Sequence, residues 1–124
     1  MTITEENQTF LESYSATIDA VGEGFEYLAE SISENAPPET ERVFRDIVVA
    51  MEQIATANEQ LQTVLEEDIE NLQTDFRDVT ALFSRWFEKQ INEEKRVLIQ
   101  TKVLPHYEAW RREMQKQIRP YIDN

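Results

Sequence analysis

The chain has 124 residues, no cysteine and a formal net charge of −13. That length predicts a single domain over residues 1–124, with a core that needs no disulfide or metal to hold it together. The lack of cysteine excludes thiol catalysis and cysteine-ligated metals, and it favours a cytoplasmic location. The acidity argues against nucleic acid as a partner, because phosphate contacts require clustered lysine and arginine.

The spacing of apolar residues predicts an all-α protein. The chain has 2 glycines and 4 prolines, so few positions suit tight turns, and strand-type alternation is absent. The longest clearly apolar run, 47–51, is far shorter than the roughly 20 residues of a membrane span. We therefore expect an antiparallel helical bundle with coiled-coil-like packing. It has three long helices over about 3–34, 38–69 and 74–104, and a shorter C-terminal amphipathic helix over about 106–121.

The first expected helix begins at a capping-box sequence, TITE, with Thr2 as N-cap and Glu5 three residues later. Its apolar residues recur at alternating spacings of three and four, which is a heptad stripe. The stripe consists of Leu11, Tyr14, Ile18, Val21, Phe25, Leu28 and Ile32. Pro37 and Pro38 end this helix and suit the first turn of the next.

The only two glycines, Gly22 and Gly24, lie inside this helix, although each costs about 1 kcal/mol relative to alanine there. In the heptad frame they occupy the two flanks of the apolar seam, where long charged residues are usual. Small flanks favour close packing against two neighbouring helices. Bulky residues from later in the chain are the expected complements, and they are Trp86, Phe87 and Trp110.

The second expected helix starts with Glu39 and Glu41 in its first turn, which favours a helix N-terminus. Its apolar residues follow a seven-residue spacing in which Asn58 occupies a core position. A buried asparagine at such a position can fix register and the number of partners. The alternative, a wet edge of the bundle, stays open at this point.

Residues 39–104 contain neither glycine nor proline, so they could form one helix about 99 Å long. Globular helices seldom exceed about 25 residues without caps. We therefore expect a turn within 66–75, with Asn71 ending one helix and Thr74 capping the next.

The C-terminal part is aromatic and basic. The third expected helix carries Phe76, Val79, Phe83, Trp86, Phe87 and Ile91, and Pro105 kinks or ends it. The last helix carries one apolar face that packs on the first two helices or offers a groove to a protein partner. That candidate partner-binding face consists of Tyr107, Trp110, Met114, Ile118 and Tyr121.

No catalytic or cofactor motif stands out. His106 is the only histidine, and no glycine-rich phosphate loop or nucleophile motif is present. We therefore expect no enzyme, no cofactor and no bound metal. An all-carboxylate metal site stays as the weakest alternative, since most acidic residues lie off the apolar stripes.

The charge is unevenly distributed, because residues 1–75 hold 18 acidic and 2 basic side chains whereas residues 76–124 hold 7 and 10. Antiparallel packing or a polarised docking surface would each explain that asymmetry. The favoured interpretation is a small non-catalytic helical interaction or adaptor protein that self-associates, with a homodimer as one form. The alternative is a binding chaperone for an exported or flagellar-type helical segment, by analogy of fold.

Overall fold

The computed structural model describes residues 3–33 and 35–123, and over these residues the regular secondary structure is all helical, joined by short irregular connections. The all-α prediction is confirmed. The elements are α1 (Glu5–Ser31), α2 (Pro38–Val64), α3 (Glu70–Ser84), the 3₁₀ turn η1 (Arg85–Glu88), α4 (Asn92–Leu98), the π-helical segment η2 (Ile99–Val103) and α5 (Leu104–Ile122). No helix of this described part is long and apolar enough to cross a membrane.

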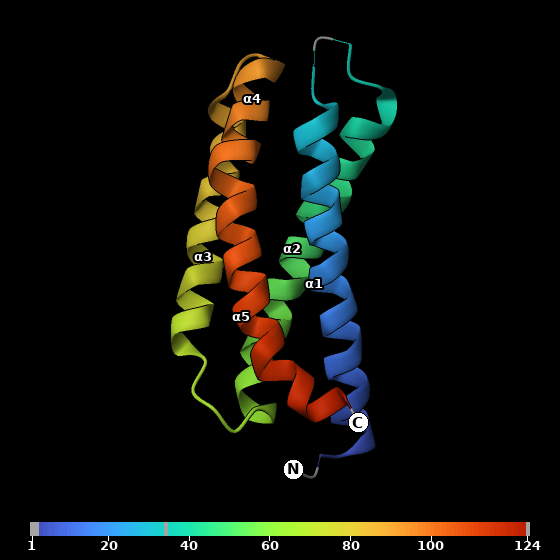
Figure 1. The fold of residues 1–124 in the computed structure, drawn as a ribbon, viewed down its shortest axis with the longest axis vertical. Coiled ribbons are helices and arrows are strands. Elements are labelled where there is room, and N and C mark those ends of the chain that lie inside the picture. The colour runs from blue at the N-terminus through green and yellow to red at the C-terminus, as the bar shows by residue number, and fades with distance from the viewer. Residues whose placement is uncertain (1–2, 34, 124) are drawn as a thin grey trace.

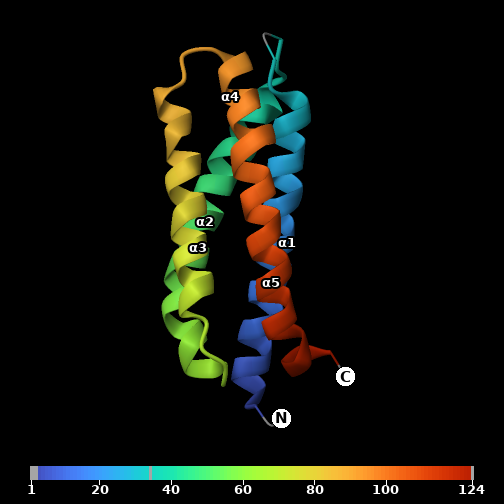
Figure 2. The ribbon, with the colours of Figure 1, turned by 60° about the vertical axis from the view of Figure 1, so that its left-hand side comes forward.

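The helices run alternately up and down the long axis (Figure 1). α1 contacts α2 on one side and α5 on the other, and α3 contacts α5. Figure 2 shows the α1–α2 and η1–α4 connections at one end of the bundle and the α2–α3 connection at the opposite end.

The first helix begins two residues later than the capping-box sequence predicts. Thr4 is the N-cap of α1, and its hydroxyl oxygen accepts a hydrogen bond from the Asn7 backbone N–H at 3.1 Å. Thr2, the predicted cap, lies outside the described residues. The start of α2 follows the prediction, with Pro37 as N-cap and Pro38 in the first turn.

The predicted turn after the second helix exists, but both helix bounds were wrong. α2 ends at Val64 and α3 begins at Glu70, so Asn71 and Thr74 lie within α3. The Gln62 side chain stabilises the turn at 65–69. Its amide donates to the Glu67 carbonyl at 2.8 Å, and its oxygen accepts from the Ile69 N–H at 2.9 Å. One side chain thereby replaces hydrogen bonds that a continuing helix would have made.

The largest correction concerns the C-terminal half. The predicted helix over 74–104 breaks at η1 and the turn 89–91, and the last helical arm runs without interruption over 92–122. Four arms result, over 5–31, 38–64, 70–88 and 92–122, in place of three long helices and a short one. Pro105 does not end a helix, because the π turn before it is wider than an α turn and gives the ring room.

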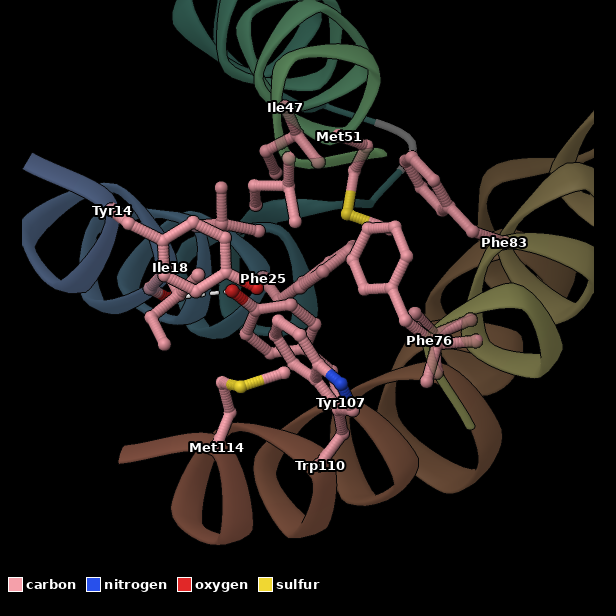
Figure 3. Close-up of a cluster of buried hydrophobic side chains, with 14 of the residues drawn as sticks. Tyr14, Ile18, Phe25, Ile47, Met51, Phe76, Phe83, Tyr107, Trp110 and Met114 are labelled. Carbon is pink, nitrogen blue, oxygen red and sulfur yellow. Dashed lines mark hydrogen bonds between the residues drawn. The ribbon is translucent and has the colours of Figure 1, made fainter. Parts of the chain in front are cut away.

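The core lies along the bundle axis and receives side chains from all four arms (Figure 3). The whole predicted stripe of α1 is buried. Phe25 contacts Phe83 of α3 and Tyr107 of α5, each at 5.1 Å between ring centroids. The heptad pattern of α1 therefore identified its core face correctly.

Candidate functional site

The predicted partner-binding face of α5 belongs to the core. Tyr107, Trp110, Met114, Ile118 and Tyr121 are all buried against the other arms. The Tyr107 hydroxyl donates to the Ile18 carbonyl, and the Tyr121 hydroxyl accepts from the Glu66 N–H at 2.9 Å. These side chains therefore form no open surface for a partner in this structure.

The glycines lie on two different helix contacts, and the expected complements were wrong. A Cβ at Gly22 would lie 2.8 Å from Glu108 Oε1 on α5. A Cβ at Gly24 would lie 3.0 Å from the Ile47 side chain on α2. Trp86, Phe87 and Trp110 do not fill these positions. α1 nevertheless has two close neighbours, one on each flank of its apolar seam.

Asn58 lies inside the bundle and not at a wet edge, with 7% of its surface exposed. Its side-chain oxygen accepts from the Tyr14 hydroxyl of α1, and its backbone carbonyl accepts from the Gln73 amide of α3 at 2.8 Å. The contacts of Asn58 therefore tie three helices of one chain together. Burial raises the pKa of the Tyr14 hydroxyl well above its ordinary value.

A polar seam joins α1 to α5. Arg111 pairs with Asp19 at 2.8 Å and with Glu108 at 2.6 Å, and the hydrogen bonds that it donates, first to Glu108 and then to Asp19, raise the pKa of the Arg111 guanidinium. The buried Gln115 accepts from the Ser15 hydroxyl at 3.0 Å and donates to Asp19 at 3.1 Å. These bonds specify the register between the two helices.

The largest exposed apolar side chains gather where the third arm ends. Phe87 is 75% exposed and Ile91 is 58% exposed. The ring of Phe87 meets Phe44 of α2 edge to face at 5.9 Å, and Phe44 stacks on Trp86 at 4.3 Å. The tight 3₁₀ turn, closed by a bond from the Lys89 N–H to the Trp86 carbonyl at 3.1 Å, directs these side chains outward.

A pocket of about 410 Å³ lies beside this aromatic cluster, and we call it the end pocket. Its walls come from the α1–α2 connection, the first turns of α2, η1 and α4, and they include Ile32, Ala36, Pro37, Phe44, Trp86 and Lys95. The Lys95 ammonium lies 5.1 Å from the centroid of Trp86. The Asn92 amide donates to the Ser33 carbonyl at 2.6 Å, and this bond links the start of α4 to the α1–α2 connection.

The lining of the end pocket is mixed, with apolar and aromatic side chains beside the polar Thr40, Glu41, Asn92 and Lys95. Glu41 and Lys95 both line it, and the adjoining segment 85–89 carries Arg85 and Lys89 against one acid, Glu88. The surrounding chain is far more acidic, with a net charge of −13. This end of the bundle is therefore the place where apolar exposure coincides with weak net charge.

Sequence reasoning missed this surface because it assigned Phe87 and Ile91 to a helical core stripe. Two signals were available. Trp86 and Phe87 are adjacent, so one helix face cannot bury both. The sequence Asn92-Glu93-Glu94 has the acidic character of a helix N-terminus, which would have placed a turn before it.

The described residues contain no cluster of potential metal ligands. No three side chains among their histidines, aspartates and glutamates come together as metal ligands would. His106 Nδ1 lies 2.7 Å from the Lys102 carbonyl, which requires a proton on Nδ1. This contact supports the backbone beside the π turn, and it brings no nucleophile near the ring.

The fold and the end surface define a four-arm helical bundle domain with an apolar patch at one end. Residues 9–113 match the family described as Domain of unknown function (DUF8042), and the chain belongs to that family. The match includes the whole of the η1 segment and the end pocket. The chain has no significant match among curated proteins or among solved structures.

Proposed function

We propose that this protein is a non-catalytic helical interaction protein that self-associates through the end of the bundle formed by η1 and the end pocket. The observation that carries the proposal is the pair of exposed side chains, Phe87 and Ile91, beside an apolar pocket. Contiguous exposed apolar surface in a folded chain is typical of an interaction site. The heptad spacing of α1 and α2 supports coiled-coil-like packing within each copy, and the lack of cysteine supports a cytoplasmic compartment.

Sedimentation equilibrium over a micromolar concentration series tests the proposal. A self-associating chain shows a mass that rises with protein concentration from that of the 14.6 kDa monomer. Added salt strengthens the association, because it screens the repulsion between two copies that each carry −13. A monomer mass throughout the series, at low and at high salt, would overturn self-association.

A binding chaperone is the second candidate, and one observation favours it: the last arm buries a long apolar face that a client helix could replace. Release of that arm would break the pairs of Arg111 with Asp19 and Gln115 with Ser15, together with the Tyr121 contact to the α2–α3 turn. Those contacts make detachment costly, so we rank the chaperone below the interaction protein.

Hydrogen exchange distinguishes the two functions. A chaperone whose last arm detaches shows fast exchange over 92–122 while α1 and α2 stay protected. A constitutive bundle shows comparable protection in the central turns of all four arms. Fast exchange confined to the last arm would favour the chaperone and count against the constitutive bundle.

A further inference from the structure

We propose that two copies associate about a two-fold axis at this end of the bundle, each inserting Phe87 into the end pocket of the other. This inference rests on the self-association proposed above and names its surface and its partner, a second copy of this chain. The argument uses the exposure of Phe87, the shape of the pocket, their relative position and the local charge.

Phe87 is the inserting side chain. It is 75% exposed, and its aromatic contact within its own chain is the edge-to-face approach to Phe44 at 5.9 Å. Aromatic side chains gain most when they enter a well-packed, desolvated pocket, and such residues dominate the binding energy of interfaces. Ile91, exposed at 58% in the connection that follows η1, adds apolar surface at the same end of the bundle.

The end pocket can receive such a ring. Its volume of about 410 Å³ is larger than that of an apolar protein cavity of ~150 Å³ that binds benzene. Phe44, Trp86 and the apolar side chains of Ile32, Ala36 and Pro37 form part of its walls, beside the polar Thr40, Glu41, Asn92 and Lys95. An inserted phenyl ring would therefore find apolar and aromatic neighbours.

The relative position of Phe87 and the end pocket favours a closed, two-fold dimer. Phe87 touches Phe44, and Phe44 lines the pocket, so the inserted side chain and its receptor site lie next to each other at one end of the chain. A patch that holds both halves of a contact is self-complementary, as a two-fold interface requires. Each association then buries two Phe87 side chains and leaves neither pocket empty.

The charges agree with this arrangement. The segment 85–91 carries two bases and one acid, whereas the α2 side of the pocket lining carries Glu41 and no base. Insertion brings the basic segment of one copy toward Glu41 of the other, which lies on α2, whereas Lys95 lies on α4. The α1 and α2 faces of two copies repel each other, because residues 1–75 hold 18 acidic and 2 basic side chains.

Three single variants test the inference by sedimentation equilibrium. Phe87→Ser removes the inserted side chain, and Ala36→Trp fills the pocket while leaving Phe87 in place. Val49→Ser is the matched control, since Val49 is 53% exposed on α2 but lies outside the pocket lining. We expect the first two variants to raise the dimer Kd at least about tenfold, the effect of losing a buried aromatic anchor. The control keeps the Kd of the unaltered chain. Circular dichroism and melting temperature verify that all three fold.

Mixing the two disruptive variants gives the decisive result. In the mixed dimer, Phe87 of the Ala36→Trp copy still finds an open pocket in the Phe87→Ser copy, so one of two insertions survives. The mixture therefore associates more strongly than either variant alone. If mixing gives no recovery, Phe87 does not insert into the end pocket. If both single variants keep the Kd of the unaltered chain, this end of the bundle is not the dimer interface, although the chain still self-associates. An unaltered chain that stays monomeric overturns both proposals.

Discussion

A methyl group added at Gly24 meets a different neighbour from one added at Gly22. At Gly24 the new Cβ lies 3.0 Å from both Cγ1 and Cδ1 of Ile47, which is buried in the α1–α2 contact. At Gly22 it lies 2.8 Å from a carboxylate oxygen of Glu108, the end of a flexible side chain. Glu108 can rotate away at the expense of its ion pair with Arg111, whereas Ile47 is held by the core.

We therefore expect Gly22→Ala to be neutral or stabilising by up to about 1 kcal/mol, the gain in helix propensity. Gly24→Ala should be less stable than Gly22→Ala by about 1 kcal/mol or more, because overpacking typically costs about 1–3 kcal/mol. Urea denaturation measures both. In a double-mutant cycle, Ile47→Val should recover part of the loss at position 24, and additive effects would contradict the contact.

Thr40 offers a second prediction at the residue scale. Its hydroxyl is buried without a hydrogen-bond partner, and an unsatisfied buried polar group costs about 1–3 kcal/mol. Thr40→Val keeps the shape and removes the hydroxyl, so the free energy of unfolding should rise by about 1 kcal/mol. Thr80→Val is the control. The Thr80 hydroxyl donates to the Phe76 carbonyl at 3.1 Å, so its removal should not raise the free energy of unfolding. Equal responses at both positions would show that the Thr40 hydroxyl is satisfied in solution.

At the scale of elements, the last arm is unusual because proline lies within it. The π segment η2 precedes Pro105, with the Leu104 N–H bonded to the Ile99 carbonyl, and His106 supports the Lys102 carbonyl through its ring. The wider turn absorbs the clash that a proline ring makes with the preceding turn of an α-helix. The arm therefore continues to Ile122 in place of ending at Pro105.

Pro105→Ala should consequently stabilise the chain by less than about 1 kcal/mol, although proline in a regular helix interior costs about 3 kcal/mol. Thermal and urea unfolding measure the difference. A gain near about 3 kcal/mol would mean that the π turn does not relieve the proline and that the arm is strained at this point.

At the scale of the whole molecule, two buried tyrosines make stability sensitive to alkaline pH. Burial raises the pKa of the Tyr14 and Tyr107 hydroxyls above the ordinary value of 10.0. Above pH 10 the unfolded chain releases these protons and the folded chain keeps them. The full stability is therefore present below that pH and is lost progressively as pH rises.

The expected loss is about 1.4 kcal/mol per pH unit for each tyrosine. Urea unfolding between about pH 9 and about pH 11.5, a range that brackets the ordinary tyrosine pKa, gives the slope. Tyr14→Phe should lower stability at neutral pH, because Asn58 loses its donor, and should reduce the alkaline slope by about the 1.4 kcal/mol per pH unit that one tyrosine contributes. An unchanged slope in this variant would show that Tyr14 ionises freely in the folded state.

The predictability of the fold varied along the chain for physical reasons. The stripe of α1 and the start of α2 followed from local rules, because heptad spacing and the fixed φ of proline act over a few residues. The α2–α3 turn depended on Gln62, whose side chain reaches residues five and seven positions away. No propensity of Gln62 itself indicates that role.

The candidate site was less predictable than the fold. The α5 face had the composition of a binding surface, yet the same aromatic and apolar side chains fill the core. Phe87 and Ile91 are apolar and were expected on the buried face of a continuous helix, yet the break at η1 leaves both exposed. Burial depends on which elements lie opposite, and that information is not local.

By itself, the sequence determined that this protein is helical, because apolar spacing and the scarcity of glycine and proline act through short-range backbone geometry. It also determined which face of α1 is buried. The tertiary structure alone decided that Ile47 and Glu108 lie against the glycines, that Asn58 joins helices of one chain, and that Phe87 stands exposed beside a pocket. These contacts join residues far apart in the chain, so they depend on how the four arms meet and not on the propensity of any one of them.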